Sequence, residues 1–115
     1  MAENKLADLS TEFAIQILKL TENIKGHYSL SNQLERSGTS IGANIREANY
    51  GQSKADMLSK FEIALKECSE TEGWWQLLFN TNGIDEENYK NYRNLCGRIR
   101  RMLIASCKTL KENAK

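Results

Sequence analysis

The residues best suited to metal binding or acid–base catalysis are few. His27 is the single histidine of the 115-residue chain, and no cysteine or second histidine lies at the spacing of a zinc ligand pair. Glu67 and Glu70 are three residues apart, as in carboxylate metal sites of helical bundles, but the Glu-x-x-His elements of such sites are missing. A solvated loop position explains His27 better than a metal site does. We therefore expect no metal-binding residues and no cofactor.

The candidate nucleophiles also lack the partners that catalysis requires. Ser37 and Ser40 have no recognisable base, and the chain contains neither a G-x-S-x-G turn nor a phosphate-binding glycine loop. Cys68, Cys96 and Cys107 form no C-x-x-C motif, and their odd number argues against a secreted disulfide framework. We expect the thiols to be small buried apolar groups. The sequence therefore predicts a protein without catalytic residues, that is, not an enzyme.

A row of basic residues near the C-terminus is the clearest local charge feature. The whole chain has a formal net charge of +1, so no global basic field attracts nucleic acid. The cations that project from one predicted helix, opposite its apolar arc and with Arg98 at the margin, are Lys90, Arg93, Arg100, Arg101, Lys108 and Lys111. Such a row indicates either RNA or DNA binding, strengthened when an oligomer repeats it, or an ordinary solvated face. Tyr89 and Tyr92 point toward the core, so aromatic stacking on bases is not obvious there.

Two unlike stripes run along the predicted helix between residues 29 and 50. The apolar stripe contains Leu30, Leu34, Ile41, Ile45 and Ala48. The polar stripe beside it contains Gln33, Arg36, Ser37, Ser40, Asn44 and Glu47. Short hydrogen-bonding side chains in such a row are typical of an edge that is shielded by protein, either by neighbouring helices or by further copies of the chain.

The next helix has a second apolar patch away from its core arc. Ile63, Trp74 and Leu77 line up at helical spacing, with Glu67 and Glu70 between them. This patch indicates either a second packing surface or a Trp74 side chain that covers the end of a bundle.

Two contact surfaces of different kinds would pair heterologously and close into a ring. If the polar stripe and the apolar patch both meet other subunits, Arg36 could pair with Glu47, Glu67 or Glu70 of a neighbour. The predicted oligomer interface therefore comprises Gln33, Arg36, Ser40, Asn44, Glu47, Ile63, Glu67, Glu70, Trp74 and Leu77.

The elements that must position these groups are four helices in one domain spanning residues 1–115. Proline is absent, and the apolar spacing predicts helices over about 5–25, 30–50, 54–80 and 86–112. We expect Ser29, Ser53 and Asp85 to cap the second, third and fourth helices, and Gly26 and Gly51 to end the first two. The fold class is all-α, an antiparallel up-and-down four-helix bundle. No apolar run approaches the roughly 20 residues that a membrane span needs, which favours a cytoplasmic protein without a membrane partner.

The central half of the chain resembles a known bacterial family. The run from Gln33 to Ala48 and the run from Lys60 to Leu78 are similar to four-helix-bundle proteins encoded in intervening sequences of 23S ribosomal RNA genes, and to accessory variability proteins of retroelements. The residues that carry this resemblance are Gln33, Leu34, Arg36, Ser40, Ile41, Asn44, Ile45, Glu47, Ile63, Ala64, Glu67 and Glu70.

This resemblance implies a non-enzymatic homo-oligomer, with a pentamer favoured. Retroelement relatives are thought to bind nucleic acid through a strongly basic surface, from which this chain departs in its near-neutral charge. The leading hypothesis is a self-assembling bundle, linked to 23S rRNA genes, that binds RNA or DNA through the basic row near the C-terminus. The alternative is a protein-binding adaptor or scaffold with no nucleic-acid role.

Overall fold

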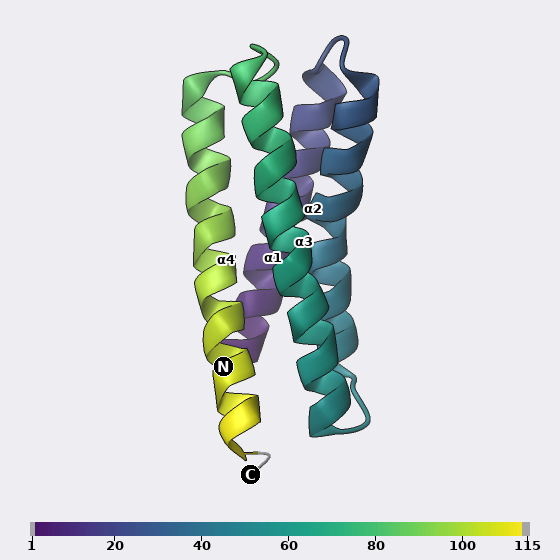
Figure 1. The fold of residues 1–115 in the computed structure, drawn as a ribbon, viewed down its shortest axis with the longest axis vertical. Coiled ribbons are helices and arrows are strands. Elements are labelled where there is room, and N and C mark those ends of the chain that lie inside the picture. The colour runs from purple at the N-terminus through teal and green to yellow at the C-terminus, as the bar shows by residue number, and fades with distance from the viewer. Residues whose placement is uncertain (1, 114–115) are drawn as a thin grey trace.

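A computed structural model describes the backbone of residues 2–113 and the side chains of residues 5–113. Within this range the chain forms four helices and no strand: α1 (Ala2–Asn23), α2 (Tyr28–Asn49), α3 (Lys54–Asn80) and α4 (Glu86–Asn113). Figure 1 shows them as parallel rods that run alternately up and down, with the α1–α2 and α3–α4 loops at one end and the α2–α3 loop at the other. The predicted all-α, antiparallel up-and-down bundle is confirmed. Among the neighbouring pairs, α2 and α3 pack most extensively and α1 and α4 least.

The ends of the helices agree with the sequence at α3 and α4. Ser53 caps α3, because its side-chain oxygen accepts a hydrogen bond from the backbone N–H of Asp56 at 3.0 Å. The Asp56 carboxylate in turn accepts from the N–H of Gln52 at 3.3 Å. At the start of α4, the Asp85 carboxylate accepts from the N–H of Asn88 at 2.7 Å. These two predicted caps are confirmed.

The prediction that Ser29 caps α2 is wrong. The helix begins at Tyr28, its N-cap is His27, and no side chain caps it. Gly26 and His27 have φ values of 75° and 50°, so two successive residues in left-handed conformation reverse the chain. The backbone conformation of these two residues therefore makes the turn, without a side-chain cap. Helix α1 ends at Asn23 rather than near Lys25.

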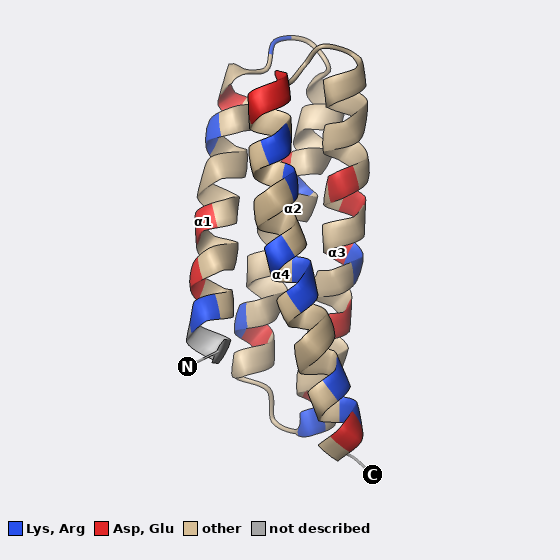
Figure 2. Ribbon diagram, turned by 90° about the vertical axis from the view of Figure 1, so that its left-hand side faces the viewer, with Lys and Arg blue, Asp and Glu red and all other residues tan. Residues whose placement is uncertain are grey.

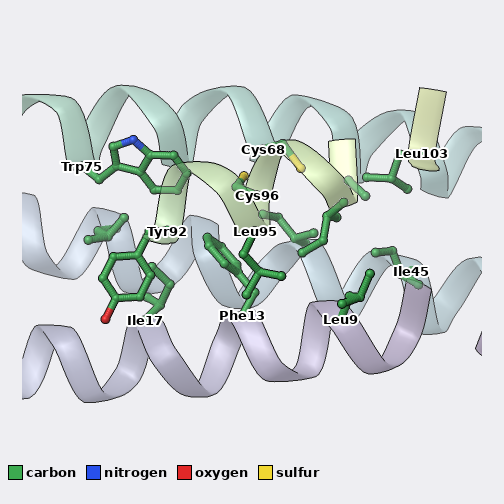
Figure 3. Close-up of a cluster of buried hydrophobic side chains, with 14 of the residues drawn as sticks. Leu9, Phe13, Ile17, Ile45, Cys68, Trp75, Tyr92, Leu95, Cys96 and Leu103 are labelled. Atoms are coloured by element: carbon green, nitrogen blue, oxygen red, sulfur yellow. The ribbon is translucent and has the colours of Figure 1, made fainter. Parts of the chain in front are cut away.

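The apolar arcs of the helices meet in one core along the bundle axis (Figure 3). Trp75 of α3 meets the edge of Phe13 of α1, with ring centroids 6.0 Å apart. Two glycines of α2 bring α1 close: a Cβ on Gly38 would lie 3.1 Å from Ile17, and one on Gly42 would lie 3.3 Å from the Ser10 hydroxyl. Small side chains on α2 therefore serve tight helix packing.

Candidate functional site

The ten predicted interface residues lie along a single face of the bundle, which we call the α2–α3 face. Five of them recur along α2 at positions 33, 36, 40, 44 and 47, and five along α3 at positions 63, 67, 70, 74 and 77. Contacts between α2 and α3 join the two rows, because Arg36 binds Glu67 and Glu70, and Glu47 binds Lys60 at 3.1 Å. The polar stripe and the apolar patch, which the sequence placed on two contact surfaces, are thus one composite surface.

Arg36 is the centre of the polar part of this face. Its guanidinium donates to the carboxylates of Glu67 at 3.2 Å and Glu70 at 2.8 Å, and its Nε donates to the Gln33 side chain at 3.2 Å. Two of the three ion pairs that were considered between subunits, those of Arg36 with Glu67 and Glu70, therefore form within one chain. The sequence could not decide this, because helical spacing shows which residues share a face but not which helix lies opposite.

Glu67 is the least exposed carboxylate of this cluster, with 7% of its surface accessible. Its pKa is raised above the usual 4.5, first because burial disfavours the charged form and then because Glu70 repels it, while Arg36 pulls the pKa back down. The Arg36 guanidinium therefore holds together two carboxylates that would otherwise repel each other.

Deeper in the same seam, two hydroxyl groups pair between helices. The Thr71 hydroxyl lies 2.9 Å from the Ser37 hydroxyl and 2.7 Å from the carbonyl oxygen of Glu67, and Ser37 reaches the Leu34 carbonyl at 3.3 Å. Both hydroxyl residues are fully buried. The neighbouring helix α3 therefore shields this member of the polar stripe, and no second copy is needed to do so.

The remaining polar residues of α2 are more open. The Ser40 hydroxyl donates to the Arg36 carbonyl at 2.7 Å and the Asn44 amide donates to the Ser40 carbonyl at 2.8 Å, and both side chains are half-buried. Gln33 and Glu47 are exposed. The polar stripe is thus buried against α3 at Ser37, half-buried at Ser40 and Asn44, and exposed at Gln33 and Glu47.

The apolar part of the α2–α3 face is accessible in the single chain. Ile63 is 40% exposed and Leu77 is 46% exposed. Trp74 is half-buried and packs against the edge of the core, but its buried indole N–H has no hydrogen-bond partner among the described residues. Ordinarily a buried indole N–H finds an acceptor.

The six basic residues predicted on α4 do not form one uniform cationic face (Figure 2). Three are paired with carboxylates of the same chain: Lys90 with Glu86 at 3.2 Å, Arg100 with Glu72 at 3.0 Å and Lys111 with Glu62 at 3.5 Å. Arg93 lies over the ring of Tyr89, which stacks on Phe79. Only Arg101 and Lys108 of the six are exposed without a charged or aromatic partner in the described chain.

The histidine and the cysteines weighed for catalysis lie in different surroundings. His27 is exposed in the α1–α2 loop, and the three cysteines are buried. The pKa of Cys96 is raised by a hydrogen bond with Cys68 and by burial, so its thiol stays protonated and is a poor nucleophile. Among the residues that the structure describes, no group of three or more His, Cys, Asp or Glu could hold a metal ion. None of the described helices is long and apolar enough to cross a bilayer.

This geometry defines a small four-helix bundle with an accessible polar and apolar face along α2 and α3. The chain belongs to the 23S rRNA-intervening sequence protein family, whose model matches residues 2–105. It is also similar to a crystal structure from Bacteroides thetaiotaomicron, described as a protein with unknown function from the S23 ribosomal protein family. That structure is 44% identical, with a TM-score of 0.89, and the match covers 94% of this chain and 99% of the other. No curated protein matches. The family resemblance seen in the sequence is confirmed, and neither description names an enzymatic activity.

Proposed function

We propose that this protein is a non-enzymatic, self-assembling helical bundle whose α2–α3 face binds further copies of the chain. The observation that carries the proposal is the apolar part of this face, where Ile63 and Leu77 stay exposed beside the half-buried Trp74. Tryptophan is also among the residues that most often dominate the energy of a protein contact.

The polar part of the face supports the same proposal. Arg36, Glu67 and Glu70 compensate one another within the chain, so a second copy that covers them buries paired charges, which costs less than burying unpaired ones. A ring requires the face to meet a different surface of the next copy. The family resemblance favours five subunits, and the absolute mass in solution decides this number.

Light scattering coupled to size-exclusion chromatography tests the proposal. We expect the wild type to have a mass several times that of the 13.1 kDa chain, and Ile63→Glu and Leu77→Glu to elute as folded monomers, because each places a charge in an apolar contact. The matched control is Ile104→Glu, which changes an exposed isoleucine, 53% accessible, on α4. This control should keep the wild-type mass. A wild type that has the mass of one chain at every concentration would contradict the proposal.

A second candidate function is nucleic-acid binding by the basic residues of α4. The observation that favours it is the exposure of Arg98, Arg101 and Lys108, none of which forms an ion pair in the described part of the chain. The family description also concerns sequences that interrupt 23S rRNA. We expect nucleic acid to co-purify at low salt, and retention on heparin to decrease in Arg101→Ala and Lys108→Ala. A wild type that does not bind heparin at low salt would exclude this function.

A further inference from the structure

The cations without ion-pair partners extend beyond α4. A shallow depression of about 360 Å³ opens between α1 and α4, and the residues around it are Lys5, Arg98, Arg101, Met102 and Ala105. Three of the five are cationic, and none is a carboxylate. Lys5 of α1 thus lies beside two arginines of α4 that are far from it in the sequence.

Charge compensation separates these cations from three others of α4. Lys90, Arg100 and Lys111 each form an ion pair with a carboxylate of the same chain. Lys5, Arg98 and Arg101 form none within residues 5–113. Cations gathered without a counter-charge repel one another and gain most from an added anion.

The depression continues into a second hollow along the same pair of helices. Arg98 lines both, and the second hollow, of about 460 Å³, has a rim of neutral amide side chains. The amides are Gln16, Asn88, Asn91 and Asn94. Lys19 adds a cation, and Glu12 is the one carboxylate that lines this second hollow. Side-chain amides donate to phosphate and sugar oxygens and can pair with the edges of unstacked bases.

We propose that the groove between α1 and α4 binds the phosphate backbone of a nucleic-acid strand, with Lys5, Arg98 and Arg101 as the phosphate contacts. This inference rests on the second candidate function and moves its centre from the outer side of α4 to the α1–α4 groove. The amides beyond Arg98 contact the sugars or bases of the same strand. The groove shares no lining residue with the α2–α3 face, so a ring assembled through that face would present several such grooves together.

Two charge-matched triple variants test the groove. Lys5→Gln/Arg98→Gln/Arg101→Gln removes three cations from the groove, and Lys90→Gln/Arg100→Gln/Lys111→Gln removes three that are paired with carboxylates. Binding of a short fluorescein-labelled RNA, and of DNA of the same sequence, is followed by fluorescence anisotropy over a range of salt. We expect the groove variant to bind at least about tenfold more weakly at low salt and the slope of log K against log salt to fall by about 2, from about 0.7 per phosphate contact.

The control variant should lose less than about threefold, because its cations do not line the groove and contact no phosphate there. Equal losses in the two variants would overturn the groove as the site while leaving nucleic-acid binding in place. Wild type that binds neither RNA nor DNA would overturn the groove and the second candidate function together. Similar affinity for RNA and DNA would support phosphate contacts alone, and a preference for RNA would add contacts to the 2′-hydroxyl. Light scattering on the groove variant, expected to show the wild-type mass, separates this result from any failure of assembly.

Discussion

The two lateral seams of the bundle, α2–α3 and α1–α4, are built in opposite ways. Along α2–α3 the helices pack most extensively, and polar side chains are matched across the seam, from the buried Ser37–Thr71 pair to the Arg36 cluster. Along α1–α4 the packing is the sparsest of the four seams, and one described side-chain hydrogen bond crosses it, from the Tyr92 hydroxyl to the Gln16 carbonyl at 3.2 Å. Two hollows, lined in part by amides and unpaired cations, lie along this seam.

This difference shows that two surfaces of one small bundle suit different kinds of binding partner. A seam whose charges are already paired within the chain offers shape and apolar area, and so it suits a permanent protein contact. A seam whose cations have no partner offers charge, and so it suits a polyanion that is exchanged with salt.

Arg36→Gln should destabilise the protein more than Ser37→Ala or Tyr92→Phe. It leaves the poorly exposed Glu67 beside Glu70 without a counter-charge, and we expect the free energy of unfolding to fall by about 1–2 kcal/mol at neutral pH. The half-exposed position of the Arg36 side chain keeps the cost below that of a fully buried pair. Urea denaturation followed by circular dichroism, at one protein concentration, measures it. The groove control Arg98→Gln should change stability by less than about 0.5 kcal/mol, and an equal cost in both variants would remove the distinction between the seams.

The same variant has a defined pH dependence. The pKa of Glu67 is raised in the folded protein by burial and by Glu70, so the folded state holds this proton more tightly than the unfolded chain does. The resulting stabilisation is complete below the usual pKa of 4.5 and is lost as the pH rises through the folded pKa. The deficit of Arg36→Gln should therefore shrink as the pH falls toward 4.5. Carboxyl NMR titration should show a higher Glu67 pKa in the variant than in the wild type, and an unchanged pKa would contradict the role assigned to Arg36.

Ser37→Ala should have an intermediate effect, about 1 kcal/mol, because it removes one member of a buried hydroxyl pair. Thr71→Val removes the other member at nearly constant volume. Since either single variant already removes the contact between the two hydroxyls, the double variant cannot lose it twice. We therefore expect its cost to be less than the sum of the two single costs, with a coupling of at least about 0.5 kcal/mol. Chemical denaturation of the four proteins measures the cycle, and strict additivity would show that the two hydroxyls do not interact.

Tyr92→Phe should have the smallest effect, about 0.5 kcal/mol, because one hydrogen bond across an open seam is replaced by water. Hydrogen exchange should quicken in α1, where Gln16 lies, and not along the α2–α3 seam. A cost larger than that of Ser37→Ala would mean that the α1–α4 seam contributes more to stability than its packing indicates.

The sequence predicted the helices well, because helix formation depends on residues that are close together in the chain. Apolar spacing placed α3 at residues 54–80, as the structure has it, and short-range capping chemistry marked its start at Ser53. The α1–α2 turn was predicted less well, because no side-chain pattern indicates the left-handed conformation of His27. The groove cations were missed in part: Arg98 stood at the margin of the α4 row, and Lys5 lies on another helix and has no sequence pattern that joins it to that row.

By itself, the sequence determined that four helices form and which arc of each turns inward, since both follow from the period of the helix and the spacing of apolar residues. Only the tertiary structure decided what lies opposite each polar residue. Arg36 could as well have paired with another subunit, and it pairs with Glu67 and Glu70 because α3 packs beside α2 in the antiparallel sense. Helical periodicity specifies an angle around one axis, whereas a site between two helices depends on their relative position and register, which the packing of the whole core sets.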